Sequence, residues 1–236
     1  MSGFAGTIRA IFLKDLLSEI RTKQLLPTMI MLGLLIGWIF RIASESAPYP
    51  AVLACAVLLV SLLFSAILAC EKSFALEQHN DCMCSLLLCP ADPGTIYLAK
   101  LLVNIVWLCL FELVTVPVVF VLFKAAPTGA WVRLVAVLLL CNIGVCSLGT
   151  LLGAVVQQTQ GSGSLLSVLA MAALCPMMLP ATSALLYLLN TGTQQTDNLG
   201  LLGMVGGFGS ALGYMIAFDA IFVTLCWLLF GFVVRE

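Results

Sequence analysis

The sequence predicts an all-α integral membrane protein, and two observations support that class. Of the 236 residues, 62% are hydrophobic and only 9% are charged, with a mean hydropathy of +1.17. Soluble domains carry about 25% charged residues, so this chain has too few polar side chains to cover a water-soluble globule. Six apolar stretches are also long enough to cross a hydrocarbon core about 30 Å thick, which takes roughly 20 helical residues.

The same observations exclude several classes of protein. A soluble enzyme and a disordered chain do not fit this composition, and a formal net charge of −1 gives no basic surface for nucleic acid. The apolar stretches lack the alternation of apolar and polar residues that marks the strands of an outer-membrane barrel. We therefore expect a single domain, residues 1–236, of six transmembrane helices. The predicted spans are 25–42, 51–70, 101–123, 134–156, 165–189 and 214–234.

The distribution of Lys and Arg predicts the orientation in the membrane, because cytoplasmic segments carry an excess of them. With the N-terminus inside, the inner segments hold Arg9, Lys14, Arg21, Lys23, Lys72, Lys100 and Arg235. The outer loops hold Arg41, Lys124 and Arg133. We therefore expect both termini in the cytoplasm. The first apolar run starts only near residue 25, so no cleavable signal peptide is expected.

The segment before the first span, residues 4–24, has the pattern of an amphipathic helix. Its apolar residues recur at helical spacing, and its charged residues lie elsewhere around the helix. The apolar set is Phe4, Ile8, Ile11, Phe12 and Leu16, and the charged set is Arg9, Lys14, Asp15 and Glu19. We interpret it as a helix in the cytoplasmic interface. The alternative is a basic anchor that only sets the orientation.

Two connections are long enough to have a structure of their own. Residues 71–100 form the longest polar insertion and are expected to face the cytoplasm. On the outer side, residues 190–213 are polar at first and then apolar and rich in glycine. Irregular backbone at membrane depth needs shelter from lipid. We therefore expect a re-entrant or short interfacial helix in that segment, before the sixth span.

The sequence motifs that would indicate nucleotide, haem or zinc binding are missing. It has no P-loop motif for ATP, and its single histidine, His79, has no partner for haem or zinc ligation. Seven of the ten cysteines fall in the predicted spans, where a thiol packs as a small apolar group. Cys82 and Cys84 form a weak metal motif, and cytoplasmic thiols normally stay reduced. We expect no catalytic residue and no metal site.

Two acidic residues, Glu112 and Asp219, fall inside predicted spans, where an ionisable group suggests a functional role. The third and sixth spans run in opposite directions. At 1.5 Å per residue the two carboxyl groups should therefore lie within about one helical turn of the same depth. They could simply hold helices together by hydrogen bonds, or they could line a cavity that changes shape during function.

Residues 71–100 resemble the coupling segment of the haem exporter protein B family of cytochrome c maturation (CcmB). The resemblance rests on Glu71-Lys-Ser-Phe-Ala-Leu-Glu77 and on the run from Leu86 through Pro90 and Asp92 to Lys100. Other matching positions are Lys14-Asp15-Leu16, Asn104, Glu112, Pro117, Gly149-Thr150, Pro176, Pro180 and Ala217-Phe218-Asp219. The sequence departs from the family at Asp81-Cys-Met-Cys84 and at residues 157–163. Both segments would face an ATPase.

The resemblance implies a membrane subunit of an ABC transporter with an ABC-2-type permease fold, in the bacterial inner membrane. Its expected partners are a cytoplasmic ATPase (CcmA), a haem-handling membrane subunit (CcmC) with its small companion (CcmD), and indirectly a haem chaperone (CcmE). ATP and haem would be held by these partners. The implied ATPase-coupling residues are Glu71, Lys72, Phe74, Glu77, Leu86, Leu87, Pro90, Asp92 and Lys100. A homodimer is expected, because two ATPase subunits need two coupling segments.

Three functions remain open from the sequence. The first is a non-catalytic subunit that couples ATP hydrolysis to release of the haem-loaded chaperone or to haem export. The second is an ABC-2-type permease that exports another small molecule or a lipid. The third is a membrane anchor that recruits the ATPase and does no conformational work. Asn104, Glu112 and Asp219 are the polar residues inside the spans that would matter to the first two functions.

Overall fold

The computed structural model describes residues 2–44, 50–79, 93–125, 131–158, 163–189 and 207–233, and within them every regular element is an α-helix. Seven helices are described. They are α1 (Ser2–Thr22), α2 (Leu25–Ala43), α3 (Pro50–His79), α5 (Pro93–Phe123), α6 (Trp131–Gln158), α7 (Gly163–Leu189) and α8 (Phe208–Val233). All but α1 are long and apolar enough to cross a membrane. The predicted class and the six predicted spans are therefore confirmed.

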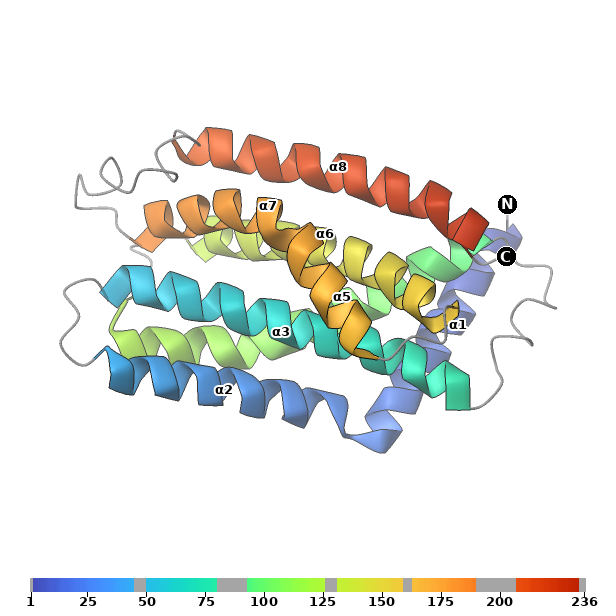
Figure 1. Ribbon diagram of the computed structural model, residues 1–236, viewed down its shortest axis with the longest axis horizontal. Coiled ribbons are helices and arrows are strands. Elements are labelled where there is room, and N and C mark those ends of the chain that lie inside the picture. Colours follow the sequence, from blue (N-terminus) through green and yellow to red (C-terminus); the bar gives the residue numbers. More distant parts are fainter. Residues whose placement is uncertain are drawn as a thin grey trace.

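The six long helices form an elongated bundle, and α1 lies across one end of it (Figure 1). That end also holds the last turns of α3, the first turns of α5 and the end of α8. The corner between α1 and α2 is made at Lys23, whose φ of 51° is left-handed. Its N–H donates to the Glu19 carbonyl at 3.0 Å, which closes the last turn of α1. This corner turns the chain from the bundle end into the first span.

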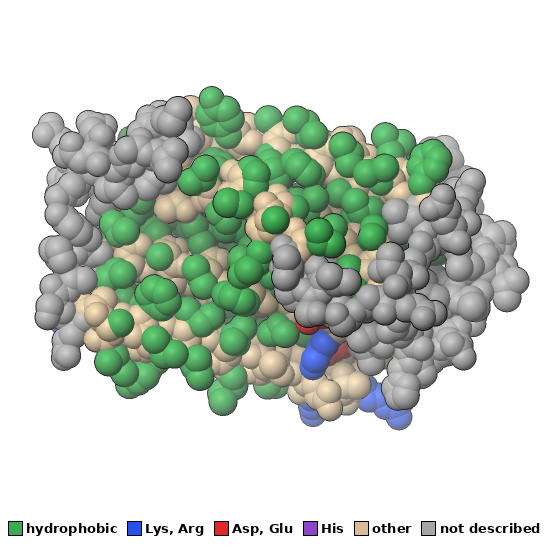
Figure 2. Space-filling model, in the orientation of Figure 1, with side chains coloured by type: hydrophobic (Ala, Val, Ile, Leu, Met, Phe, Trp, Pro, Cys, Tyr) green, Lys and Arg blue, Asp and Glu red, His purple; other side chains and the backbone are tan. Residues whose placement is uncertain are grey.

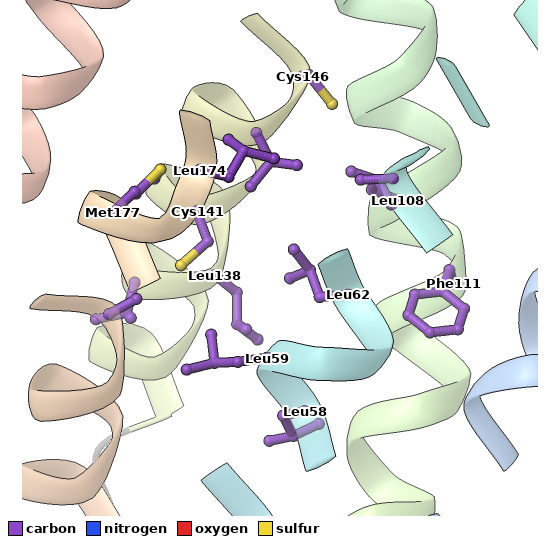
Figure 3. Close-up of a cluster of buried hydrophobic side chains, with 14 of the residues drawn as sticks. Leu58, Leu59, Leu62, Leu108, Phe111, Leu138, Cys141, Cys146, Leu174 and Met177 are labelled. Carbon is purple, nitrogen blue, oxygen red and sulfur yellow. The ribbon is translucent and has the colours of Figure 1, made fainter. Parts of the chain in front are cut away.

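Helices α3 and α6 lie at the centre of the bundle, while α2 and α8 are peripheral. Of the most apolar stretch of each helix, 61% is buried in α3 and 72% in α6, against 22% in both α2 and α8. The core combines leucines of α3 with side chains of α5, α6 and α7 (Figure 3). Close approach of helices depends on small residues, as is usual between membrane helices. Gly149 of α6, for example, lies against Cys70 of α3, because a Cβ there would be 2.6 Å from the thiol sulfur.

The surface of the bundle is apolar over most of the described residues seen in Figure 2, with Lys and Arg gathered near the junction of α1 and α2. Large side chains such as Leu113, Val121 and Phe232 are exposed along α5 and α8. Exposure of so much apolar surface to water would be unfavourable, whereas lipid tails solvate it well. The apolar band therefore fits a protein that lies in a bilayer.

Helix α7 bends along its length in Figure 1, and its interior contains Pro176 and Pro180. Each proline lacks an N–H and clashes with the carbonyl four residues earlier, which bends a helix. Pro117 lies in the interior of α5 in the same way. The proline positions thus place irregular hydrogen bonding in two of the helices that surround α6.

Three helices extend beyond the apolar runs that define the predicted spans. Helix α3 continues from the predicted end at residue 70 to His79, and α5 begins at Pro93 rather than at residue 101. Proline is favoured at the first position of a helix, where its missing N–H costs nothing. Helix α8 begins at Phe208, so residues 208–213 are helical and not part of a re-entrant segment. Residues 190–206, the rest of that predicted segment, lie outside the described residues.

Candidate functional site

The predicted coupling segment is built on two helical arms. We call residues 71–79, the end of α3, and residues 93–100, the start of α5, the coupling arms. Lys100 joins them, because its Nζ donates to the Ser73 carbonyl oxygen at 3.3 Å. The Lys100 side chain is only 1% exposed, so this bond is shielded from water. One turn further into the membrane, Asn104 Nδ2 donates to the Cys70 sulfur at 3.7 Å. Helices α3 and α5 are thus fastened to each other at two levels, once within the arms and once a turn deeper.

The second arm also contacts α6 and α8. The Tyr97 hydroxyl donates to the Ser147 carbonyl oxygen of α6 at 3.3 Å, and the Tyr97 ring lies 5.4 Å from the ring of Phe230 of α8. Gly94 lies directly against the indole of Trp227, so closely that a Cβ at residue 94 would overlap its Nε1. The first two turns of α5 are therefore in contact with three other helices.

The structure describes only part of the predicted ATPase-coupling set. Glu71 and Lys72 lie on α3 and are half-buried, and Lys100 faces the interior of the bundle rather than a partner. Phe74 and Glu77 are in α3, but their side chains lie outside the described set, as do residues 80–92 with Leu86, Leu87, Pro90 and Asp92. The contacts of Gly94 and Tyr97 were not predicted. Tyr97 precedes Lys100 by three residues on one helical face, which could have suggested its inward position.

The second group of interest is a layer of polar side chains inside the bundle. We define the polar layer as Glu112 of α5, Asn142 of α6 and Asp219 of α8, together with Gly144 of α6, against which Asp219 packs. Asn142 Nδ2 donates to Glu112 Oε2 at 3.0 Å, which links α5 to α6. Glu112 Oε1 and Asn142 Oδ1 are buried, and neither has a hydrogen-bond partner among the described residues. This pair thus leaves two acceptor oxygens unused.

Asp219 occupies the other side of α6. It is 6% exposed, and within the described part of the chain neither of its carboxyl oxygens has a hydrogen-bond partner. It can approach α6 because residue 144 is glycine: a Cβ there would lie 2.5 Å from Asp219 Oδ1 and would also overlap the Met177 sulfur of α7. Gly144 is therefore the point at which α6, α7 and α8 come together.

The two acids lie at nearly the same depth, as the sequence indicates. They contact positions 142 and 144 of α6, which are about 3 Å apart along the helix axis. These positions are about 200° apart around α6, so the carboxyl groups lie on opposite sides of that helix. No sequence pattern singles out Asn142 or Gly144, because a lone Asn or Gly in a span has no distinctive spacing.

The described residues show no other polar cluster with obvious chemistry. They contain no group of three His, Cys, Asp or Glu side chains that could hold a metal. The seven described cysteines are free thiols within the spanning helices. Cys82 and Cys84, the weak metal motif, lie outside the described residues.

The fold, the coupling arms and the polar layer define a membrane protein with several spanning helices. Helix α5 connects the two groups, because it begins with a coupling arm and carries Glu112 of the polar layer. The comparison with protein families is more specific: the model of the CcmB protein family matches residues 7–225, and the chain belongs to that family. It is therefore a membrane-spanning permease subunit of the ABC transporter of cytochrome c maturation. Family membership also implies partnership with a CcmA ATPase and other Ccm components. A comparison with curated proteins found no match.

Proposed function

We propose that the chain transmits the ATP-driven motion of CcmA across the membrane without itself catalysing a reaction. In this proposal, the motion releases the haem-loaded chaperone CcmE from CcmC with its companion CcmD, or exports haem. ATP and haem are held by those partners and not by this chain. The subunit lies in the inner membrane with both termini in the cytoplasm, and two copies pair with two ATPase subunits.

The contacts of the second coupling arm are the main support for this proposal. A displacement of residues 80–92 by the ATPase would act on both arms together, because Lys100 and Asn104 fasten α5 to α3. Tyr97 and Gly94 would pass the same displacement to α6 and α8. A plain connecting loop would need none of these buried contacts. A membrane anchor that only recruits the ATPase would not need them either.

The polar layer is the part of the bundle best suited to change its contacts during such a motion. The carboxyl groups of Glu112 and Asp219 flank α6, and several of the oxygens there are unpartnered in the described structure. Leaving a buried polar group unpaired costs about 1–3 kcal/mol. A shift of α6 that brings hydrogen-bond donors to these acceptor oxygens would recover part of that free energy. We therefore propose that α6 moves relative to α5 and α8 when the coupling arms are displaced.

Two substitutions separate docking of the ATPase from transmission of its motion. Leu87→Asp places a charge in the predicted apolar docking contact, so co-purification of CcmA with this subunit should fall about tenfold or more. That factor corresponds to about 1.4 kcal/mol of lost binding free energy. Lys100→Met removes the bond to the Ser73 carbonyl but not the docking surface. It should therefore leave co-purification unchanged while lowering the yield of holo-cytochrome c.

Lys124→Met is the control, because Lys124 is an exposed lysine at the other end of the bundle. This control should change neither readout. Full co-purification of CcmA with the Leu87→Asp variant would contradict the assignment of residues 71–100 as the coupling segment. A normal holo-cytochrome yield with Lys100→Met would show that the bond between the coupling arms is not needed to transmit motion.

A further inference from the structure

The outward face of α1 has no role in the proposal above, and its composition differs sharply from that of the inward face. Ile11, Phe12 and Leu16 pack against the core of the bundle. Both acidic residues of α1 also turn inward: Glu19 is 7% exposed, and the Asp15 side chain is 16% exposed. The helix thus keeps its negative charges away from its surroundings.

The outward face has an apolar stripe bordered by basic residues. Leu13, Leu17 and Ile20 are 41%, 61% and 49% exposed, and their spacing places them on one side of the helix. At about 100° per residue, Arg9 lies at one edge of the stripe and Arg21 lies at the other, next to Lys14. The half-exposed Lys14 amino group lies 3.7 Å from Asp15 Oδ1, and an ion pair with a solvent-exposed member contributes little free energy. The exposed charged side chains of α1 are therefore all basic among the described residues.

We propose that this face of α1 binds anionic phospholipid. Leu13, Leu17 and Ile20 would enter the upper acyl region, and the guanidinium groups of Arg9 and Arg21 would contact phosphate groups at the two edges. Long basic side chains can keep an apolar stem in lipid while the charged end reaches the headgroups. A basic residue near an anionic leaflet strengthens binding about fivefold.

The position of α1 favours lipid over a soluble protein as the occupant of this face. The helix crosses the end of the bundle and joins α2 through the corner at Lys23 (Figure 1). In α2, Met31 and Leu35 are exposed on the membrane-spanning surface, at 70% and 57%. The apolar stripe of α1 is therefore followed, directly after the corner at Lys23, by a helix surface that is itself solvated by lipid. A soluble ATPase would instead have to bury Leu13, Leu17 and Ile20 and also supply acidic side chains for Arg9 and Arg21.

Native mass spectrometry of the purified full-length protein tests this proposal. The protein is incubated in detergent with equal amounts of phosphatidylglycerol and phosphatidylcholine, and the ratio of the two retained lipids is measured. The Arg9→Gln/Arg21→Gln variant should lower that ratio about thirtyfold, because two charges are removed. The charge-conserving Arg9→Lys/Arg21→Lys variant should keep most of the wild-type ratio. If the Lys variant lowered the ratio as much as the Gln variant does, binding through charge would be contradicted.

The matched control is Lys124→Gln/Arg133→Gln, which removes two exposed basic side chains near the ends of α5 and α6. It should leave the lipid ratio near the wild-type value. An unchanged ratio in Arg9→Gln/Arg21→Gln, or an equal fall in the control, would overturn the proposal. An unchanged ratio together with weaker co-purification of CcmA would assign the face to the ATPase instead. Because the lipid readout needs neither ATP nor haem, its result is independent of the proposed function.

Discussion

Gly144 is the residue on which the meeting of three helices depends. The space that a side chain would fill at this position is already occupied by the Met177 thioether and by Oδ1 of Asp219. Both groups are fully or nearly fully buried, so they cannot simply turn outward. Even the smallest side chain at residue 144 must therefore push α7 or α8 away from α6.

Gly144→Ala should destabilise the protein by about 1–3 kcal/mol, the usual cost of forcing extra volume into a packed core. The measurement is the apparent Tm of the purified protein in detergent. Gly213→Ala is the matched control, because nothing lies within 4 Å of a Cβ at that position of α8. Alanine there should leave the Tm unchanged or raise it, since alanine favours helix more than glycine does. Equal Tm values for the two variants would contradict the close packing at Gly144.

At the scale of elements, the hydrogen bond between Asn142 and Glu112 links α5, which begins at the coupling arm, to the central helix α6. Hydrogen bonds between membrane helices contribute on average only about 0.6 kcal/mol. Breaking one by removing a single partner costs more, because the other group is left unpaired away from water. The loss of stability should therefore be largest when only Asn142 or only Glu112 is replaced.

Glu112→Leu should lower stability by about 1–3 kcal/mol, because it leaves the Asn142 amide with only its weak contact to the Cys109 sulfur of α5 at 3.8 Å. Glu112→Gln keeps an oxygen that can accept from Asn142 Nδ2, and should lie much closer to the wild type. Leu113→Ala, on the exposed side of α5, is the control and should have little effect. The apparent Tm in detergent measures all three variants. If the Leu and Gln variants at residue 112 were equally stable, the bond would have no structural importance.

At the scale of the whole molecule, the sequence was sufficient for the class, the number of spans and the common depth of Glu112 and Asp219. These follow from apolar length and from 1.5 Å per residue, which tertiary structure does not alter. The helix ends were harder to predict, because the charged residues of 71–79 and the Pro-Gly start of 93–100 interrupt the apolar pattern although the helices include both segments. The contacts of Gly94 with Trp227 and of Tyr97 with Ser147 join residues far apart in the chain. No local pattern predicts such pairs.

The most direct test of the proposed function uses a strain from which the gene for this chain is deleted. Covalent haem on c-type cytochromes and haem retained on CcmE are measured together. A subunit that transmits ATP-driven motion for chaperone release predicts lost cytochromes with haem-loaded CcmE trapped on CcmC. An empty chaperone would instead assign haem delivery to this subunit. Normal cytochromes would contradict any role in their maturation.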